Sequence, residues 1–171
     1  MSRVPGDEVL LALAHRIGER LGDAHLQLAT AESCTGGWVA KLLTDVPGCS
    51  AWFERGFVTY TNQSKQDLLG VPADVLDEHG AVSEATVRAM AEGALHHSKA
   101  SLTLSVSGIA GPGGGRPDKP VGLIWFGWAQ QAAPGKPDVR SESRQFNGNR
   151  DAVRRQAVAR ALEGVLELTG G

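Results

Sequence analysis

The sequence predicts an α/β protein, a three-layer α/β/α sandwich with helices on both faces of a mixed, mainly parallel sheet. Helix-type and strand-type segments alternate over much of the chain, which is typical of a sheet covered by helices on both sides. A short turn joins the last two strand-type segments, so we expect these two strands to pair antiparallel. The chain has 171 residues with no internal repeat and no linker, which favours one domain over residues 1–171.

The first half of the chain supplies helices and strands in alternation. Apolar residues recur at helical spacing until Gly22, a residue that commonly ends helices. Aromatic and β-branched residues around Phe57 favour a strand, while Gly70 and Pro72 separate two short helices. The expected elements are a helix at 7–21, a strand at 26–31, a helix at 38–43, a strand at 53–61, and helices at 64–69 and 73–79.

The second half contributes most of the strands. Ser83 is a good N-cap for a long helix, and five glycines between residues 108 and 115 interrupt regular structure. A last helix carries apolar residues along one face. The expected elements are a helix at 84–98, strands at 102–106, 121–130 and 139–146, a turn at 132–136, and a helix at 151–168.

Composition excludes several classes of protein. The formal net charge is -2, so there is no basic footprint for nucleic acid. No apolar run approaches the roughly 18 to 20 residues that span a bilayer, and the first eight residues lack the apolar core of a signal peptide. We therefore expect a cytoplasmic protein with no membrane partner. Cys34, Cys49 and five histidines show no metal-binding spacing, so we expect no metal and no cofactor.

The first candidate for chemistry is the segment 30–37, where a buried strand ends and a helix begins. Backbone N–H groups of a first helical turn point toward one spot. A hydroxyl there, from Ser33, is placed to attack a carbonyl while N–H groups near Thr35, Gly36 and Gly37 hold the resulting oxyanion. The alternative is that Ser33 or Thr35 only caps the helix. Cys34 is a second candidate nucleophile, because helix N-termini lower thiol pKa values.

A nucleophilic serine needs a base, and Lys65 is the residue we select. Lysine must lose most of its proton to act as a base, which requires its pKa to fall from about 10.4 to roughly 7 to 8. A shift of about 3 pKa units corresponds to about 4 kcal/mol, which the fold has to supply. Lys65 lies just after a predicted strand, at the start of a short helix. The alternative is a solvated surface charge, which is the usual state of lysine.

Two further segments suggest an anion site. The glycine-rich segment 108–115 directly follows a strand and resembles a cradle of backbone N–H groups, although it matches neither the dinucleotide-binding nor the Walker pattern. Arg150 lies near the start of the last helix, where its planar guanidinium suits a phosphate. The alternatives are a flexible surface loop and a solvent-exposed arginine.

Taken together, these segments resemble one family, the C-terminal domain of the CinA proteins, which are nicotinamide-nucleotide amidohydrolases. The resemblance covers about residues 8–168 and follows the family's order. Each motif is weak by itself, and the ordered set is specific. The matching motifs are Ala31-Glu32-Ser33-Cys34-Thr35-Gly36-Gly37, Tyr60-x-Asn62-x-x-Lys65, Gly80-Ala81-Val82-Ser83, Gly108-Ile109-Ala110-Gly111-Pro112-Gly113-Gly114, Lys119-Pro120-Val121-Gly122 and Phe146-x-Gly148-x-Arg150.

The resemblance implies a compact α/β/α homo-oligomer that hydrolyses the carboxamide of nicotinamide mononucleotide to nicotinate mononucleotide and ammonia, in pyridine-nucleotide salvage. The family's nucleophile falls on Ser33, its lysine base on Lys65 and a tyrosine of the site on Tyr60. The chain looks like the stand-alone form, without the long N-terminal domain of full CinA proteins. The residues expected to bind substrate are Ser107, Gly108, Ala110, Gly111, Gly113, Gly114 and Arg150.

Two positions depart from the family pattern. Asn149 stands where many members have aspartate, which removes a charge but keeps the ability to cap a helix. Ser107 stands where many members have threonine, which keeps the hydroxyl and loses a methyl group. Two other functions stay open from the residues themselves: a non-catalytic nucleotide-binding or regulatory module, and an amidase for another small amide.

Overall fold

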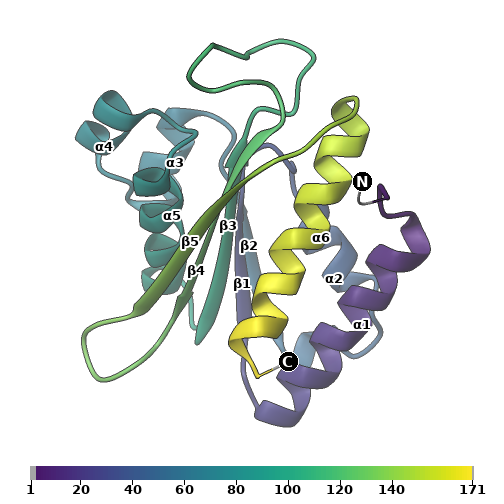
Figure 1. Cartoon of the computed structure of the whole chain (residues 1–171). Helices are drawn as coiled ribbons and strands as arrows, with labels where there is room; N and C mark the ends of the chain where they lie inside the picture. Colours follow the sequence, from purple (N-terminus) through teal and green to yellow (C-terminus); the bar gives the residue numbers. More distant parts are fainter. Residues whose placement is uncertain (1–2, 171) are drawn as a thin grey trace.

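A five-stranded sheet with strand order β2-β1-β3-β4-β5 forms the middle layer of the computed structural model, which describes residues 3–170 (Figure 1). The outer bounds of the expected domain, residues 1 and 171, lie outside this range. β1 pairs parallel with β2 and β3, whereas β4 pairs antiparallel with both β3 and β5. Four strands therefore run in one direction and β4 runs in the other, which confirms the mixed, mainly parallel sheet. The strands are β1 (Leu28–Glu32), β2 (Phe53–Val58), β3 (Leu102–Gly108), β4 (Leu123–Gln130) and β5 (Asp138–Gln145).

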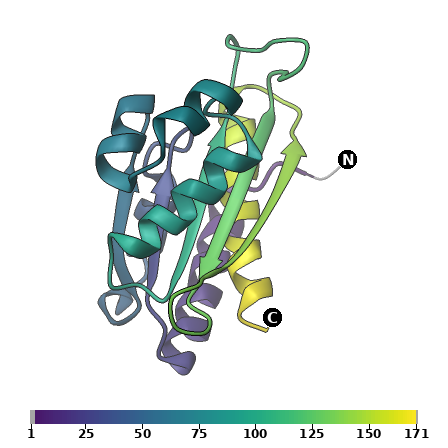
Figure 2. The ribbon, with the colours of Figure 1, turned by 90° about the vertical axis from the view of Figure 1, so that its left-hand side faces the viewer.

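Helices cover both faces of the sheet, as the sequence predicts (Figures 1 and 2). One face carries α1, α2 and α6, and the other carries α3, α4 and α5. A short 3-10 helix, η1 (Cys49–Ala51), lies before β2. The helices are α1 (Asp7–Ala24), α2 (Trp38–Thr44), α3 (Asn62–Leu69), α4 (Ala73–His79), α5 (Glu84–His96) and α6 (Arg150–Leu168).

Separate apolar clusters hold the two outer layers to the sheet. The larger cluster joins the apolar faces of α1 and α6 to strand residues such as Leu104 and Phe126, which have no exposed surface. A smaller cluster packs Val87 and Met90 of α5 against Ala31 of β1. Burial of apolar surface at about 25 cal/mol per Å² is the main force holding these layers together.

Helix α3 packs directly on the backbone of α5. A Cβ atom at Gly93 of α5 would clash with the carbonyl oxygen of Leu69, at the end of α3. Glycine is therefore required at this crossing, because only a residue without a Cβ lets the two backbones approach so closely. Lys65 lies one turn before Leu69 on the same helix, so this contact also fixes the distance between Lys65 and the sheet.

The ends of most elements differ from the prediction by one to three residues. α1 passes Gly22 and runs to Ala24, because His25 rather than the glycine adopts the left-handed φ, of 54°, that ends the helix. β2 ends at Val58 rather than at residue 61, because the chain turns away there and the carbonyl groups of Thr59 and Tyr60 face Lys65. α3 begins at Asn62, two residues early, because Thr61 forms a capping box with Ser64. β4 begins at Leu123 because Gly122 adopts a left-handed φ of 93°.

Candidate active site

Residues from four strand ends meet at one edge of the sheet. Because β1, β2, β3 and β5 run in the same direction, their carboxyl ends lie together, and this is where open α/β sheets place their ligand sites. Ser33 follows β1, Tyr60 follows β2 by two residues, Ser107 lies at the end of β3, and Arg150 follows β5 after a short connection. Topology therefore gathers residues that lie far apart in the sequence.

A serine and a lysine form the buried centre of this edge. The Nζ atom of Lys65 lies 3.0 Å from the Oγ atom of Ser33, and Lys65 has no exposed surface. The same Nζ atom donates to the carbonyl oxygens of Thr59 at 2.6 Å and Tyr60 at 3.4 Å. Carbonyl oxygens only accept hydrogen bonds, so the neutral form of the amine donates its two N–H groups to these two carbonyls. Its lone pair is then left to face the serine hydroxyl.

Burial prepares this amine to act as a base. Removal from water disfavours the charged form and lowers the pKa of Lys65 from 10.5 to about 8. The alternative of a solvated surface lysine is therefore wrong. The capping alternative for Ser33 and Thr35 is wrong as well, because Gly37 is the N-cap of α2 and the N–H groups of Val39 and Ala40 in the first turn donate to Glu32 instead.

The turn from Ser33 to Gly37 leaves two backbone donors unused. The N–H of Gly36 donates to the carbonyl of Ser33 at 3.0 Å, and the N–H of Gly37 faces the Glu32 carboxylate. Among residues 3–170, the N–H groups of Cys34 and Thr35 make no backbone or side-chain hydrogen bond. The predicted donor Gly36 is thus engaged within the turn, and the positive φ angles of Gly36 and Gly37, 61° and 96°, shape the bend.

Glu32 holds the turn from the side of the sheet. Its carboxylate accepts from the hydroxyl of Thr35 at 2.6 Å and from the N–H groups of Val39 at 2.8 Å and Ala40 at 3.1 Å. Burial raises the pKa of Glu32, and these hydrogen bonds oppose the rise. No role for Glu32 is predicted from the sequence alone. The sequence does contain a signal for one, because a carboxyl group within a fully buried strand requires polar partners.

Arg154 holds the same turn from the side of α6. Its Nε atom donates to the carbonyl of Cys34 and its Nη2 atom to the carbonyl of Thr35, both at 3.1 Å. The sequence analysis missed this residue too. Arg154 lies four residues after Arg150, hence on the same face of α6, and that spacing was the available signal.

Cys34 is unsuited to be the nucleophile. Burial raises the pKa of its thiol to about 12, which leaves almost no thiolate at neutral pH. The helix N-terminus nearby does not outweigh the loss of hydration. Ser33 is therefore the better nucleophile of these two neighbours.

Two exposed side chains, Tyr60 and Arg150, lie at the same edge together with the buried Gly111, and we call these three residues the exposed cluster. Arg150 donates through Nη1 to the carbonyl of Gly111 at 2.7 Å and through Nη2 to the hydroxyl of Tyr60 at 3.4 Å. Tyr60 is 61% exposed. Asn149 caps α6 by accepting from the N–H of Ala152 at 2.9 Å, so the substitution of the family's aspartate keeps the cap.

The base of the glycine-rich segment is packed. The hydroxyl of Ser107 is buried and donates to the carbonyl of Ala81 at 2.8 Å. A side chain at Gly108 would clash with Ile124, and Ala110 belongs to the larger apolar cluster. Gly111 has a left-handed φ of 85°. Ser107, Gly108 and Ala110 thus have structural contacts that explain them without a ligand.

The tip of the segment is open. Residues 112–118 are all exposed, and the loop extends beyond the sheet in Figure 1. Gly113 has no neighbouring atom where a Cβ would lie, and Gly114 has a φ of 87°. The tip therefore has the exposure expected of a surface loop, whereas Arg150 anchors the base of the segment through the Gly111 carbonyl.

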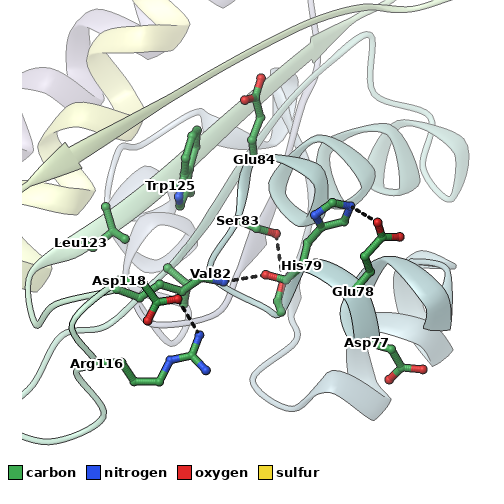
Figure 3. A pocket seen from close by; sticks show the side chains of 12 residues that line it. Asp77, Glu78, His79, Val82, Ser83, Glu84, Arg116, Asp118, Leu123 and Trp125 are labelled. Atoms are coloured by element: carbon green, nitrogen blue, oxygen red, sulfur yellow. Dashed lines mark hydrogen bonds and ion pairs between the residues drawn. The ribbon is translucent and has the colours of Figure 1, made fainter.

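A cavity of about 560 Å³ lies on the other side of this loop, between the end of α4, the start of α5 and residues 116–119 (Figure 3). Lys119 donates to the carbonyl of His79 at 2.6 Å and Ser83 to that of Gly80 at 2.9 Å. Neither Ser33 nor Lys65 lines it. Its hydrogen bonds tie the returning loop to α4, and it is separate from the serine–lysine pair.

Within residues 3–170, no helix is both long enough and apolar enough to cross a bilayer. Over the same residues, no group of three or more histidine, cysteine, aspartate or glutamate side chains is arranged to hold a metal ion.

The fold and site define a class: α/β proteins that build a serine–amine pair at the carboxyl edge of a sheet, an arrangement suited to nucleophilic attack on a carbonyl. The chain belongs to the CinA C-terminal domain family, whose model matches residues 10–169. This confirms the family resemblance seen in the motifs.

Similar proteins come from several bacteria. The chain is 52% identical over 157 residues to nicotinamide-nucleotide amidohydrolase PncC of Escherichia coli (strain K12), covering 92% of this chain and 93% of that one. It is 50% identical over 159 residues to PncC of Pseudomonas putida, covering 93% and 96%. The crystal structure of competence/damage inducible protein CihA from Agrobacterium tumefaciens superposes with a TM-score of 0.86 at 44% identity, covering 98% and 99%.

Proposed function

We propose that this protein hydrolyses the carboxamide of nicotinamide mononucleotide to nicotinate mononucleotide and ammonia, with Ser33 as nucleophile and Lys65 as base. The observation that carries the proposal is the buried contact of 3.0 Å between Lys65 Nζ and Ser33 Oγ. Relatives at 50–52% identity bear the name nicotinamide-nucleotide amidohydrolase, which supports the substrate. Such hydrolysis belongs to pyridine-nucleotide salvage.

The first half of the reaction forms an ester on the serine. Neutral Lys65 accepts the hydroxyl proton while Ser33 Oγ attacks the carboxamide carbon. The protonated lysine then gives a proton to the amide nitrogen, the C–N bond breaks and ammonia leaves. Water attacks the ester in the second half, Lys65 accepts the water's proton, and the C–O bond to Ser33 breaks as the hydroxyl is restored. The net change consumes one water and needs no cofactor.

The oxyanion formed at each attack needs hydrogen-bond donors. The N–H of the residue after a nucleophile commonly supplies one, and here the N–H groups of Cys34 and Thr35 have no protein partner among the described residues. We therefore assign the oxyanion to the Thr35 and Cys34 N–H groups, in place of Gly36 and Gly37. Such a donor typically contributes about 3 to 4 kcal/mol to transition-state stabilisation.

The exposed cluster is suited to the phosphate of the substrate. The Arg150 guanidinium supplies a positive charge with fixed geometry. Gly113 and Gly114 at the loop tip leave backbone N–H groups accessible at close range. Tyr60 contributes an exposed ring beside Arg150. Binding energy would thus come from the edge of the site, and bond breaking would take place at its buried centre.

The test is to incubate purified protein with nicotinamide mononucleotide and to measure ammonia and nicotinate mononucleotide. We expect turnover by the wild type and a loss of about 10⁴-fold or more in Ser33→Ala, with substrate still bound. Ser101→Ala, which changes a serine at the opposite edge of the sheet, is the control. Tight binding without any ammonia would instead indicate a non-catalytic nucleotide-binding module, and equal rates with free nicotinamide would indicate a broader amidase.

We also propose that the chain works in the cytoplasm as a homo-oligomer of a single-domain subunit. The homo-oligomer and the single-domain subunit are what the family resemblance implies. Light scattering coupled to size-exclusion chromatography measures the mass of the assembly, and a monomeric mass at working concentration would contradict the homo-oligomer.

A further inference from the structure

Arg154 donates hydrogen bonds to the turn of residues 33–37, and within residues 3–170 it makes no other hydrogen bond. Its two guanidinium contacts reach the carbonyl groups of Cys34 and Thr35. The side chain is half-buried and also stacks on Trp38, with its Cζ atom 5.3 Å from the ring centroid. Nothing in the proposed reaction uses Arg154 directly, yet its only polar contacts are with the residues that follow the nucleophile.

The geometry of the peptide bond gives these contacts a consequence. In a trans peptide the C=O and N–H groups lie in one plane and point in opposite directions. The peptide between Thr35 and Gly36 is held at both ends, because its carbonyl accepts from Arg154 and from the Trp38 N–H, and its own N–H donates to the Ser33 carbonyl. The peptide between Cys34 and Thr35 is held only at its carbonyl, by Arg154 Nε. Its N–H remains available to a ligand.

We propose that Arg154 is a positioning residue: by holding the Cys34 carbonyl, it orients the Thr35 N–H as an oxyanion donor. This inference rests on the proposed function. A donor must point toward the place where charge develops before the reaction begins, because a group that first has to rotate loses much of its effect. A cation on the carbonyl side also polarises the peptide and strengthens its N–H as a donor.

A guanidinium suits this task better than an ammonium group. It presents two donors in a fixed plane and so fixes two adjacent carbonyls at once. A Cβ atom at Gly36 would lie 3.5 Å from Arg154 Nη2, so the turn and the guanidinium are in close contact. A lysine at position 154 has a single compact charge and is expected to hold one carbonyl at a time.

Arg155 offers a matched control. Its Cζ atom lies 5.1 Å from the same Trp38 ring, but its hydrogen bonds go to Asp7 at 2.6 Å and Asp151 at 2.8 Å. Removing Arg155 therefore takes away a stacked cation from the same helix and the same tryptophan, while leaving the contacts of the turn in place.

The experiment compares Arg154→Ala, Arg154→Lys and Arg155→Ala with the wild type in steady-state hydrolysis of nicotinamide mononucleotide. We expect kcat to fall about 100-fold in Arg154→Ala, with KM changed less than about threefold. Arg154→Lys should recover part of the loss, and Arg155→Ala should keep kcat within about threefold. The pH midpoint of kcat should stay the same in all variants, because the surroundings of Lys65 are unchanged.

Amide hydrogen exchange followed by NMR gives a readout that does not depend on turnover. We expect the Gly36 amide to exchange faster in Arg154→Ala than in the wild type or Arg155→Ala, because the turn loses its anchor. Near-normal kcat in a folded Arg154→Ala, an equal loss in Arg155→Ala, or unchanged Gly36 exchange would each overturn the inference. A wild type that releases no ammonia would overturn the proposed function instead, and the exchange measurement would still decide whether Arg154 holds the turn.

Discussion

The turn of residues 33–37, which carries the proposed nucleophile, and the glycine-rich segment, residues 108–115, both follow central strands and both contain glycines with positive φ. They nevertheless differ in almost every contact. Charged side chains fix the turn from two sides, Glu32 from β1 and Arg154 from α6. The glycine-rich segment is anchored at its base by Arg150, and its tip is exposed. The same residue type therefore serves a rigid bend in one region and open access in the other.

The difference suggests a division of labour within one sheet edge. Bond breaking requires groups that are held in one geometry before the substrate arrives, and the turn and Lys65 are held in this way. Recognition of a charged group at the surface tolerates a more open arrangement, and the loop near Arg150 is open. Changes in the first region should act mainly on kcat, and changes in the second mainly on KM.

Replacing Lys65 by methionine separates the two regions most sharply. General-base catalysis typically contributes 10²- to 10⁴-fold, so we expect kcat to fall about 10³-fold or more, while affinity for nicotinamide mononucleotide changes little. Calorimetric binding and the ammonia assay measure the two quantities. Lys99→Met, which alters an exposed lysine, is the control and should match the wild type. Near-normal turnover at pH 7 in Lys65→Met would remove the lysine from the mechanism.

The same variant should be more stable than the wild type. At pH 7 the native wild type holds the buried Lys65 amine mostly in its charged form. The difference between its ordinary pKa of 10.5 and its native pKa of about 8 means that this charge lowers the free energy of unfolding by about 3 kcal/mol. The variant avoids this cost but loses the hydrogen bonds to two carbonyl groups, so we expect its free energy of unfolding in urea to be higher by about 1 to 2 kcal/mol. Between pH 8 and pH 10.5 the unfolded wild type binds more protons than the native one. Wild-type stability therefore rises with pH there, and the advantage of the variant should shrink.

Replacing Arg150 by alanine tests the exposed region. A charge-assisted hydrogen bond to phosphate contributes about 1.5 to 3 kcal/mol, so KM for nicotinamide mononucleotide should rise about 10- to 100-fold with kcat changed far less. Nicotinamide riboside, which lacks the phosphate, should be hydrolysed equally well by the variant and the wild type. A fall in kcat at constant KM would place Arg150 in the chemical step and would end the distinction between the two regions.

The pH dependence of kcat gives the smallest effect. With a pKa of about 8 for Lys65, about a tenth of the amine is neutral at pH 7 and about nine tenths at pH 9. Turnover should rise about tenfold over this range, with its midpoint near pH 8. Arg150→Ala should keep the same midpoint, because Arg150 does not contact Lys65. A flat profile would mean that a step other than proton transfer limits the rate.

Most elements of the fold could be predicted, because hydrophobic periodicity and glycine or proline breaks mark them. Errors lay at ends decided by tertiary contacts. The strand expected to reach residue 61 stops at Val58, since Lys65 draws the next carbonyls out of the ladder. The early start of α3 was readable, because Thr61 and Ser64 have the spacing of a capping box.

The candidate site likewise contains features that the sequence predicts and features that depend on tertiary contacts. Ser33 and Lys65 were named from the sequence, and the structure brings them together. Which backbone donors remain free depends on the folded geometry of the turn, so the sequence could not show that the Gly36 N–H donates to the Ser33 carbonyl. Arg154 reaches the turn across 120 positions of sequence; helical spacing places it on the same face of α6 as Arg150 but does not identify the carbonyl groups that it contacts.

The crossing of α3 and α5 at Gly93 has a consequence for where substitutions can disturb the site. Position 93 contacts neither Ser33 nor Lys65, but a larger residue there would clash with Leu69 and push α3 outward, which moves the Lys65 amine away from the Ser33 hydroxyl. A buried glycine in a neighbouring helix thus controls the distance between the two proposed catalytic groups, and a mutational survey restricted to residues near Ser33 would overlook it.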